Sequence, residues 1–211
     1  MSLQVKKNYN ENKYNEVYRL NREVTSFEAK VLLKFIYAID KENPAILDLG
    51  CGTGKPYDEF LVNNYCCVTG VDFSKNHISW ARLNVPNANY ICSDIMKFKC
   101  IDVYDGAVML YSLFHIHRDH HLLLLKKIYN SISDNGKVLL NVRREDSGNI
   151  KYRENFCGKP MYWSHYGYTE FKRIAEESGF KVHFLGDEKD YGSNESHIWL
   201  LLKKTHKNNF I

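Results

Sequence analysis

The sequence predicts an α/β fold, a three-layer sandwich in which helices cover both faces of a seven-stranded, mostly parallel sheet. Short apolar runs of strand length alternate with helical patterns through the first five predicted strands, as in chains that build parallel sheets. A glycine-rich turn follows the first run, and an acidic residue lies at the end of each of the first three. A further helix and two apolar runs, which we expect to form a terminal hairpin, complete the count.

The elements are predicted from the spacing of their apolar residues. Helices are predicted at about 24–40, 58–64, 75–83, 122–132 and 169–178. Strands are predicted at 45–49, 66–72, 89–93, 104–110, 137–142, 180–185 and 197–202. Ser74 and Thr169 are predicted N-caps, and Gly136 and Gly179 are predicted to end helices.

One domain is expected, over residues 24–203. Residues 1–23 are polar and rich in asparagine and tyrosine, which predicts a mobile arm or a marginal helix. Residues 204–211 are predicted to be a tail. The segment 143–168 shows little periodicity and is predicted to be a long aromatic loop at the carboxyl edge of the sheet.

The composition argues against several classes of protein. Of the 211 residues, 44% are hydrophobic, and the net charge of +4 is spread along the chain, which gives nucleic-acid binding no support. No apolar run reaches the roughly 18 residues of a membrane span, and no secretory signal is recognised, so we expect a soluble cytoplasmic protein. None of the six cysteines forms a C-x-x-C pair, which favours reduced, packed thiols.

The stretch AILDLGCGTG at residues 45–54 carries most of the functional information. A buried strand leads into Gly-x-Gly-x-Gly, and glycines allow positive φ and a close approach of the backbone to a ligand. Dinucleotide-binding folds use G-x-G-x-x-G, so the third glycine comes one residue early here. The acid-x-Gly-x-Gly-x-Gly run that begins at Asp48 instead resembles motif I of the class I S-adenosylmethionine (SAM) methyltransferases. A glycine turn without a ligand is the alternative.

This resemblance implies a SAM site at the carboxyl ends of the first four strands. In the family, an acid after the second strand binds the ribose hydroxyls, an acid after the third strand accepts a hydrogen bond from the adenine amino group, and the fourth strand ends beside the transferable methyl. The family's sheet contains one antiparallel strand. The implied cofactor-binding residues are Asp48, Gly50, Cys51, Gly52, Gly54, Asp72, Phe73, Asp94, Ile95, Tyr111 and Ser112. A surface carboxylate is the alternative for Asp72.

The aromatic segment 143–168 is the predicted pocket for the methyl acceptor. Long loops in compact domains are usually functional, and class I enzymes commonly build their substrate pocket from an insertion at this point. Some members of the family also close an N-terminal segment with tyrosines over the cofactor as a lid. The predicted acceptor-binding residues are Tyr14, Arg143, Tyr162, Trp163, His165 and Tyr166. A frayed terminus and a packed cover over the sheet edge are the alternatives.

Two histidines, His115 and His165, are candidates for a catalytic base, which is needed only if the acceptor must lose a proton. Four histidines lie between residues 115 and 121. No carboxylate or cysteine completes an evident ligand set beside them, so no metal is predicted.

Together these features predict a SAM-dependent methyltransferase that transfers a methyl group to a small molecule by in-line displacement, with S-adenosylhomocysteine (SAH) as the product. Two alternatives stay open: an RNA or protein methyltransferase, and a module that binds SAM or a nucleoside without catalysis. A dehydrogenase is disfavoured by the glycine spacing. The sequence leaves the acceptor and the oligomeric state open.

Overall fold

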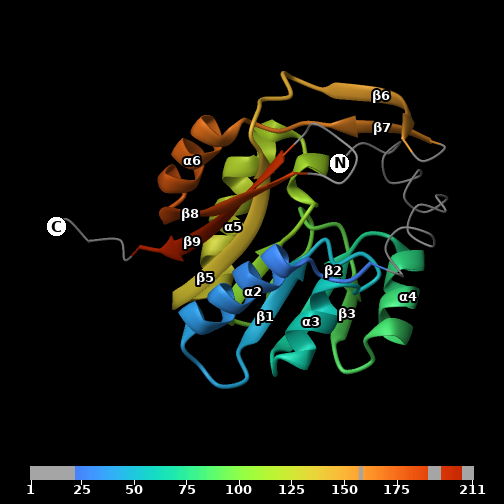
Figure 1. Ribbon diagram of the computed structural model, residues 1–211, viewed down its shortest axis with the longest axis vertical. Coiled ribbons are helices and arrows are strands. Elements are labelled where there is room, and N and C mark those ends of the chain that lie inside the picture. Colours follow the sequence, from blue (N-terminus) through green and yellow to red (C-terminus); the bar gives the residue numbers. More distant parts are fainter. Residues whose placement is uncertain (1–21, 157–158, 190–195, 206–211) are drawn as a thin grey trace.

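A seven-stranded sheet forms the centre of the computed structural model, which describes residues 22–156, 159–189 and 196–205 (Figure 1). Its strands are β1 (Ala45–Leu49), β2 (Cys67–Asp72), β3 (Asn89–Cys92), β4 (Tyr104–Met109), β5 (Ile132–Arg143), β8 (Phe180–Lys189) and β9 (Ser196–Lys204). The order is β3-β2-β1-β4-β5-β9-β8. The first five strands are parallel, and β9 is antiparallel to both of its neighbours. The predicted sheet with one antiparallel strand is therefore confirmed.

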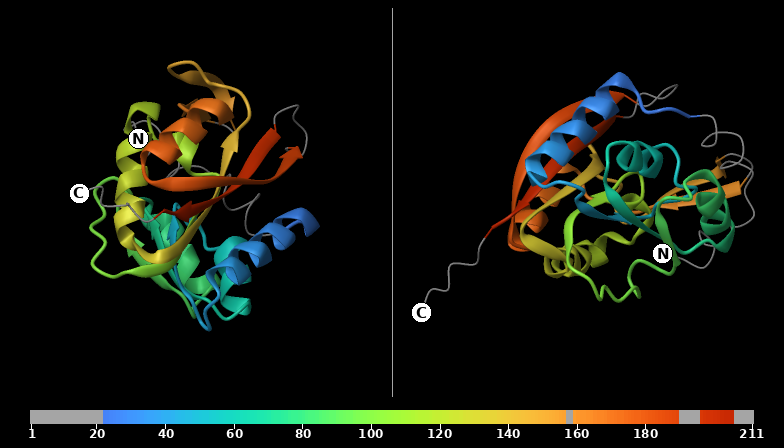
Figure 2. Two further views of the ribbon diagram at one scale, coloured as in Figure 1. Left: turned by 90° about the vertical axis from the view of Figure 1, so that its left-hand side faces the viewer. Right: turned by 90° about the horizontal axis from the view of Figure 1, so that it is seen from below.

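Helices cover both faces of this sheet, as Figure 2 shows for α2 on one side and α5 on the other. The helices are α2 (Ser26–Ile39), α3 (Tyr57–Asn63), α4 (Lys75–Asn84), α5 (His121–Ser131) and α6 (Tyr168–Glu177), with short 3-10 turns η2 (Leu113–His115) and η3 (Arg118–His120). Apolar side chains of α2 and α3 share one buried cluster, and those of α5 and α6 share another. The three-layer sandwich follows from these two clusters.

The pleat of β1 decides which layer each of its side chains meets. Ile46 packs in the cluster of α2 and α3, whereas Leu47 and Leu49 pack in the cluster of α5 and α6. Because side chains alternate along a strand, Asp48 lies on the same face as Ile46. A carboxylate is therefore placed inside the sandwich on the side of α3.

The predicted helix termini are partly confirmed. Thr25 and Glu28 form a reciprocal capping box at the start of α2, and Ser74 caps α4 through the backbone amide of His77. Gly179 follows α6 with a φ of +96°. The N-cap of α6 is Gly167, so the prediction for Thr169 is wrong by two residues.

The strand β5 begins earlier than the sequence predicts. The helix α5 ends at Ser131, and Ile132 already pairs with Tyr104 of β4, with an irregular register before the next pair. Gly136 therefore lies inside β5 and does not end the helix. Pairing with a strand about 30 residues earlier in the chain overrides the local turn signal.

The aromatic segment 143–168 is more ordered than predicted. It contains β6 (Lys151–Phe156) and β7 (Lys159–Trp163), which pair as a separate antiparallel hairpin. The hairpin lies beyond the carboxyl ends of the parallel strands (Figure 1). An ordered cover, rather than an irregular loop, therefore lies at this edge of the sheet.

Two further predictions concern thiols and membranes. Cys51, Cys66, Cys67, Cys92 and Cys100 are free thiols, and Cys157 is outside the described residues. In the described part of the chain, no helix is long and apolar enough to cross a membrane.

Candidate active site

The glycine turn between β1 and α3 needs glycine at all three of its positions. Gly50, Gly52 and Gly54 have φ values of +98°, +57° and +77°, which L side chains adopt only with strain. A Cβ on Gly50 would lie 2.4 Å from Cβ of Ser112, and one on Gly54 would lie 2.6 Å from the hydroxyl of Tyr90. The turn therefore has no side chains at these three positions, so a ligand can approach its backbone closely.

Asp72, at the end of β2, faces this turn. Its Oδ2 accepts from the amide of Gly52 at 3.1 Å, its Oδ1 accepts from the amide of Ser74 at 2.8 Å, and Nδ1 of His77 lies 3.4 Å from Oδ1. The side chain is only 6% exposed. These contacts fix the carboxylate between two backbone amides, so the alternative of a surface carboxylate is wrong. The next residue, Phe73, is half-buried.

The ends of β1, β3 and β4 meet beside the glycine turn. Asp94 follows β3 and holds a tight turn, in which its Oδ1 accepts from the amide of Met96 at 2.9 Å. Cδ1 of buried Ile95 would lie 3.8 Å from a Cβ on Gly50, which also faces Ser112. The hydroxyl of Ser112 donates to the carbonyl of Leu49 at 2.7 Å. The structure thus gathers predicted cofactor residues from three strands at one point.

Tyr111 enters the site in a left-handed conformation, with a φ of +55°. Its amide donates to Oδ1 of Asn141 on β5 at 2.8 Å, and its ring stacks on that of Tyr57 at 6.1 Å. A non-glycine residue with positive φ is a recognised sign of a functional site. The contacts from α3 and β5 hold it there.

A buried ionic network that the sequence did not reveal anchors the tyrosine ring. Glu28 is fully buried and accepts from the hydroxyl of Tyr111 at 3.2 Å, from Tyr57 and from Arg22. The guanidinium of Arg22 also lies 5.3 Å from the Tyr111 ring centroid. Burial and the charge of Glu28 raise the pKa of Tyr111, so the phenol stays protonated at neutral pH. The network joins the first residues of the described chain to the site.

Asp48 has a carboxyl neighbour that sequence patterns did not single out. Asp58 in the first turn of α3 is completely buried, and burial and the charge of Asp48 raise its pKa well above the usual range. Two adjacent carboxyl groups in a buried site do not both ionise, so Asp58 carries the proton. One negative charge, not two, is present beneath the glycine turn.

Replacing Asp58 with asparagine is expected to stabilise the protein at pH 7–8. The folded carboxyl keeps its proton to a higher pH than the unfolded one, so its contribution to stability is complete at low pH and is lost as the pH rises. The amide stays neutral and still donates to Asp48. Urea unfolding at pH 4 and pH 8 measures the effect: a gain at pH 8 that is absent at pH 4 is expected, and an equal change at both pH values would contradict the shared proton.

The predicted acceptor residues lie between the β6–β7 hairpin and the segment after β4. Trp163 is buried with Phe114 and Met161, and its indole lies 6.3 Å from the half-buried ring of His115. The half-buried ring of Tyr162 lies 4.9 Å from that of Tyr152. The amide of Ser164 donates to the carbonyl of Phe114 at 2.9 Å, which pins the end of β7 beside η2. Tyr14 is outside the described residues.

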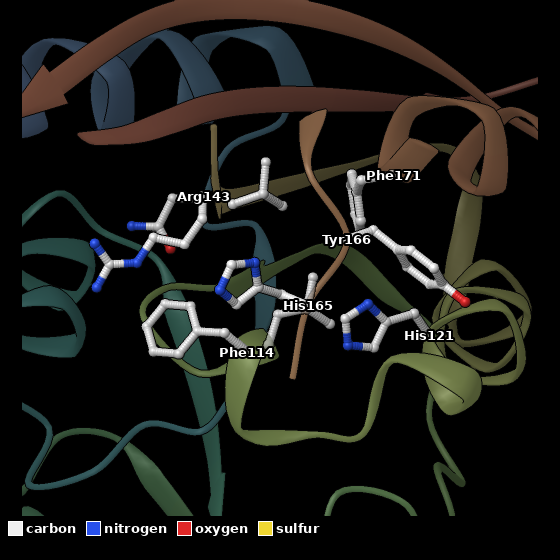
Figure 3. Close-up of a pocket in the computed structure, with 9 residues that line it drawn as sticks. Phe114, His121, Arg143, His165, Tyr166 and Phe171 are labelled. Carbon is white, nitrogen blue, oxygen red and sulfur yellow. The ribbon is translucent and has the colours of Figure 1, made fainter. Parts of the chain in front are cut away.

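A narrow cleft opens next to these residues at the carboxyl end of β5 (Figure 3). Its empty space, the part open to solvent included, is about 180 Å³, but no part of it is wide enough to hold a water molecule. The lining residues are Leu113, Phe114, His121, Asn141, Val142, Arg143, His165, Tyr166 and Phe171. Three of the predicted acceptor residues, Arg143, His165 and Tyr166, therefore meet at one cavity.

His165 is the candidate base whose state the structure defines best. Burial and the neighbouring charge of Arg143 lower its pKa to about 4, so the imidazole is neutral at pH 7 but is a weaker base than an ordinary histidine. His121, which the sequence assigned to no role, has a pKa lowered to about 4 by burial. In the described ranges, no three histidine, cysteine or acidic side chains gather as a metal site.

The comparisons with known proteins agree with this arrangement. A family model described as a methyltransferase domain matches residues 19–184. A carboxy-S-adenosyl-L-methionine synthase of Helicobacter pylori is 27% identical over 160 residues, which are 72% of this chain and 66% of that protein. A caffeic acid 3-O-methyltransferase of Medicago sativa is 27% identical over 96 residues, 46% of this chain and 26% of that enzyme. The chain thus spans less than two thirds of the length of these curated relatives.

Solved structures share the fold at low sequence identity. A magnesium protoporphyrin IX methyltransferase from Synechocystis PCC 6803 with bound SAH aligns with a TM-score of 0.70 at 13% identity, covering 95% of this chain and 98% of that one. A SAM-dependent methyltransferase from Methanosarcina mazei gives a TM-score of 0.70 at 14% identity, with coverages of 87% and 99%. Because the family model spans most of the chain and the sheet is mostly parallel with one antiparallel strand, as predicted, this chain belongs to the methyltransferase domain family and has the class I fold.

Proposed function

We propose that the protein transfers a methyl group from SAM to a small-molecule acceptor and releases SAH. The observation that carries the proposal is the bare glycine turn, with three positive φ values, facing Asp72 and adjoining Ile95 and Ser112. Ligands of open α/β sheets bind at this carboxyl edge. An acid between two backbone amides suits a pair of ribose hydroxyls, and the aliphatic side chain of Ile95 suits packing against the flat adenine ring.

The start of α3 favours a ligand without phosphate groups. Helix N-termini bind phosphates through their positive end, which negative charge in the first turn opposes. Here the first turn carries the protonated Asp58 and Glu59, which pairs with Lys55, and the charged Asp48 lies beneath. A pyrophosphate at this turn would meet the negative charge of Asp48, whereas a sulfonium cation is attracted by it. The electrostatics therefore support SAM over NAD.

The chain's own residues would bind, orient and protect the reacting groups. SAM, when bound, supplies an electrophilic methyl carbon attached to a good leaving group. The protein's part is then to align the acceptor with that carbon and to exclude water. Tyr111 and Ser112, fixed by Asn141 and Leu49, would form the floor beside the methyl. Neutral His165 would take a proton at an imidazole nitrogen when the acceptor has one to lose, and His115 is the second candidate.

A small molecule is the acceptor class that the site supports best. The ordered β6–β7 hairpin covers the edge, and the cleft beside it is narrow. The names of two similar proteins, caffeic acid 3-O-methyltransferase and magnesium protoporphyrin IX methyltransferase, give small molecules as their substrates. The residues proposed to contact the acceptor are Arg143, Tyr162, Trp163, His165 and Tyr166.

Calorimetric titration with SAH, with NAD as the control, tests the proposal. We expect SAH to bind in the micromolar range, about −8 kcal/mol, and NAD to give no measurable heat. Binding of NAD without SAH would contradict the proposal, because it would assign the glycine turn to a dinucleotide.

Asp72→Ala is expected to weaken SAH binding by about 1–3 kcal/mol, the scale for leaving buried polar groups without partners. Asp102→Ala is the matched control, since this exposed acid lies before β4 at the opposite edge of the sheet. Unchanged SAH affinity in Asp72→Ala would contradict the role of Asp72 in holding the ribose. Urea unfolding of both variants separates lost binding from lost folding.

A further inference from the structure

His77, in the first turn of α4, brings a ring nitrogen to the carboxylate of Asp72. Its Nδ1 lies 3.4 Å from Oδ1 of Asp72, and the two side chains are 6% and 8% exposed. Among the described residues, no other histidine, lysine or arginine nitrogen lies within ion-pair distance of this carboxylate. Such a contact at the surface would contribute little, but a buried pair is screened much less by solvent and salt.

The way in which α4 begins explains why the ring of His77 meets Asp72. In a capping box, the N-cap hydroxyl accepts from the amide of the N3 residue, and the N3 side chain accepts from the N-cap amide. Here the hydroxyl of Ser74 accepts from the amide of His77 at 3.3 Å, so the first half of this arrangement is present. The amide of Ser74 donates instead to Oδ1 of Asp72 at 2.8 Å. The carboxylate of Asp72 thus takes the place of the N3 acceptor, and the N3 ring lies against that carboxylate.

Contacts from three parts of the chain restrain the carboxyl group of Asp72. Oδ2 accepts from the amide of Gly52 in the glycine turn at 3.1 Å. Oδ1 meets the amide of Ser74, directly after β2, and the ring of His77 on α4. Rotation about the Cβ–Cγ bond of Asp72 would move both oxygens together and disturb all three contacts. The ring of His77 therefore helps to hold the carboxylate in one plane.

The acceptor positions that remain on Asp72 match a pair of hydroxyls. A carboxylate offers about four acceptor positions. The backbone amides of Gly52 and Ser74 fill two of them. At 3.4 Å, Nδ1 of His77 is too far away for a short hydrogen bond, so it attracts Oδ1 without filling a third position. Two positions are left for the two hydroxyls of a ribose.

We propose that His77 is a positioning residue for the ribose of SAM, which acts through Asp72 by orienting the carboxylate toward the 2′- and 3′-hydroxyls. The inference rests on the proposed function, since it requires SAM or SAH at the glycine turn. It assigns to one residue of this chain a part in the preference for a ribose over a deoxyribose. A carboxylate only accepts hydrogen bonds, so the ring form that serves this role carries a hydrogen on Nδ1.

The test combines one change in the protein with one change in the ligand. The full-length wild-type protein and His77→Leu are each titrated by calorimetry with SAH and with its 2′-deoxy analogue. The wild-type protein is expected to bind SAH about tenfold more tightly than the analogue, the scale of one hydrogen bond to a charged group. In His77→Leu this preference is expected to fall to about threefold or less, because the two changes are coupled through Asp72.

His77→Asn is the rescue variant. Asparagine and leucine have nearly the same size, but asparagine places an amide N–H the same number of bonds from Cβ as Nδ1 of histidine. This variant is expected to keep most of the preference for SAH over the 2′-deoxy analogue. A loss that depends on the N–H, and not on the volume of the side chain, is what a positioning role requires.

Ala81→Gly is the matched structural control. Ala81 is a fully buried residue of the same helix, and glycine there weakens the helix without removing a polar group. The control is expected to change the affinities for SAH and for the 2′-deoxy analogue by the same factor, which leaves the preference unchanged. Urea unfolding shows whether each variant is folded under the conditions of the titration.

Three results with the variants would overturn the inference. An unchanged preference in His77→Leu, an equal loss in His77→Asn, or an equal loss in Ala81→Gly would show that His77 does not act through the carboxylate of Asp72. Equal binding of SAH and its 2′-deoxy analogue by the wild-type protein would also overturn it. These outcomes leave the proposed function intact as long as SAH binds, whereas a wild-type protein that does not bind SAH refutes the methyltransferase proposal itself.

Discussion

Gly50→Ala is expected to abolish SAH binding and to lower the free energy of unfolding by about 2–5 kcal/mol, from backbone strain and overpacking together. The φ of Gly50 is +98°, where an L-residue is strained. The added Cβ would lie 2.4 Å from Cβ and 2.9 Å from Oγ of Ser112. Rotation of the serine side chain can move Oγ but not Cβ, which is fixed to the backbone, so the backbone itself must move.

The movement would reach the centre of the candidate site. Ser112 donates to the carbonyl of Leu49 at 2.7 Å, which ties the end of β4 to the end of β1. Pushing Ser112 away breaks this bond and shifts Tyr111, the adjacent residue with positive φ. Loss of binding therefore accompanies the loss of stability, and the two are measured by SAH calorimetry and urea unfolding.

Gly148 provides a matched control for the glycine turn. Its φ is +68°, but nothing lies within 4 Å of the Cβ that alanine would add. Gly148→Ala is expected to show only the conformational cost, about 1 kcal/mol, and unchanged SAH binding. Gly50→Ala combined with Ser112→Gly removes the steric part and should recover part of the stability. If Gly50→Ala changes the free energy of unfolding and SAH binding no more than Gly148→Ala does, the prediction that the turn packs closely against Ser112 is wrong.

Much of the fold follows from sequence periodicity, because each buried strand and amphipathic helix has a local pattern. The predictions fail where pairing between strands that are distant in the sequence determines the local structure. Asp134-Asn135-Gly136 has the composition of a helix stop, yet these residues belong to β5 because Ile132 already pairs with Tyr104. The β6–β7 hairpin was missed because its strands have exposed faces and no apolar alternation.

The residues of the candidate site also divide into those that the sequence predicts and those that only the folded structure reveals. Asp72 and the glycine turn are predictable, because the carboxyl ends of parallel strands meet at one edge and because positive φ requires glycine. Glu28 and Asp58 are not, because acids in the first turn of a helix are ordinary surface features. Only the folded chain reveals that Glu28 is buried against Tyr111, 83 residues away, and that Asp58 faces Asp48.

Among the four histidines at residues 115–121, the sequence made only His115 a candidate base, and the structure shows that the four differ in burial. His121 is completely buried, with its ring 5.8 Å from that of Tyr166 and 6.4 Å from that of Phe171. Burial lowers its pKa from 6.5 to about 4, and the charges of His165 and Arg118 act in the same direction. The backbone carbonyls of Ile116 and Leu113 oppose this shift only in part.

The wild-type protein is therefore expected to lose about 2 kcal/mol of stability through His121 between pH 7 and pH 5. The unfolded imidazole takes up a proton near pH 6.5, whereas the folded one does so only near pH 4. The unfolded state binds more protons in this interval, so stability is complete above pH 6.5 and falls as the pH falls toward 4. Below pH 4 both states are protonated, and the contribution stays lost.

His121→Gln isolates this contribution from the other groups that titrate in acid. Glutamine retains a donor for the carbonyl of Ile116 but cannot be protonated. The variant is expected to be less stable at pH 7, and its unfolding free energy should fall by about 2 kcal/mol less than the wild-type value between pH 7 and pH 5. His120→Gln, at the exposed neighbouring position, should parallel the wild type. Parallel curves for His121→Gln and the wild type would mean that the buried imidazole is charged in the folded protein, which requires an anion or water at Nδ1.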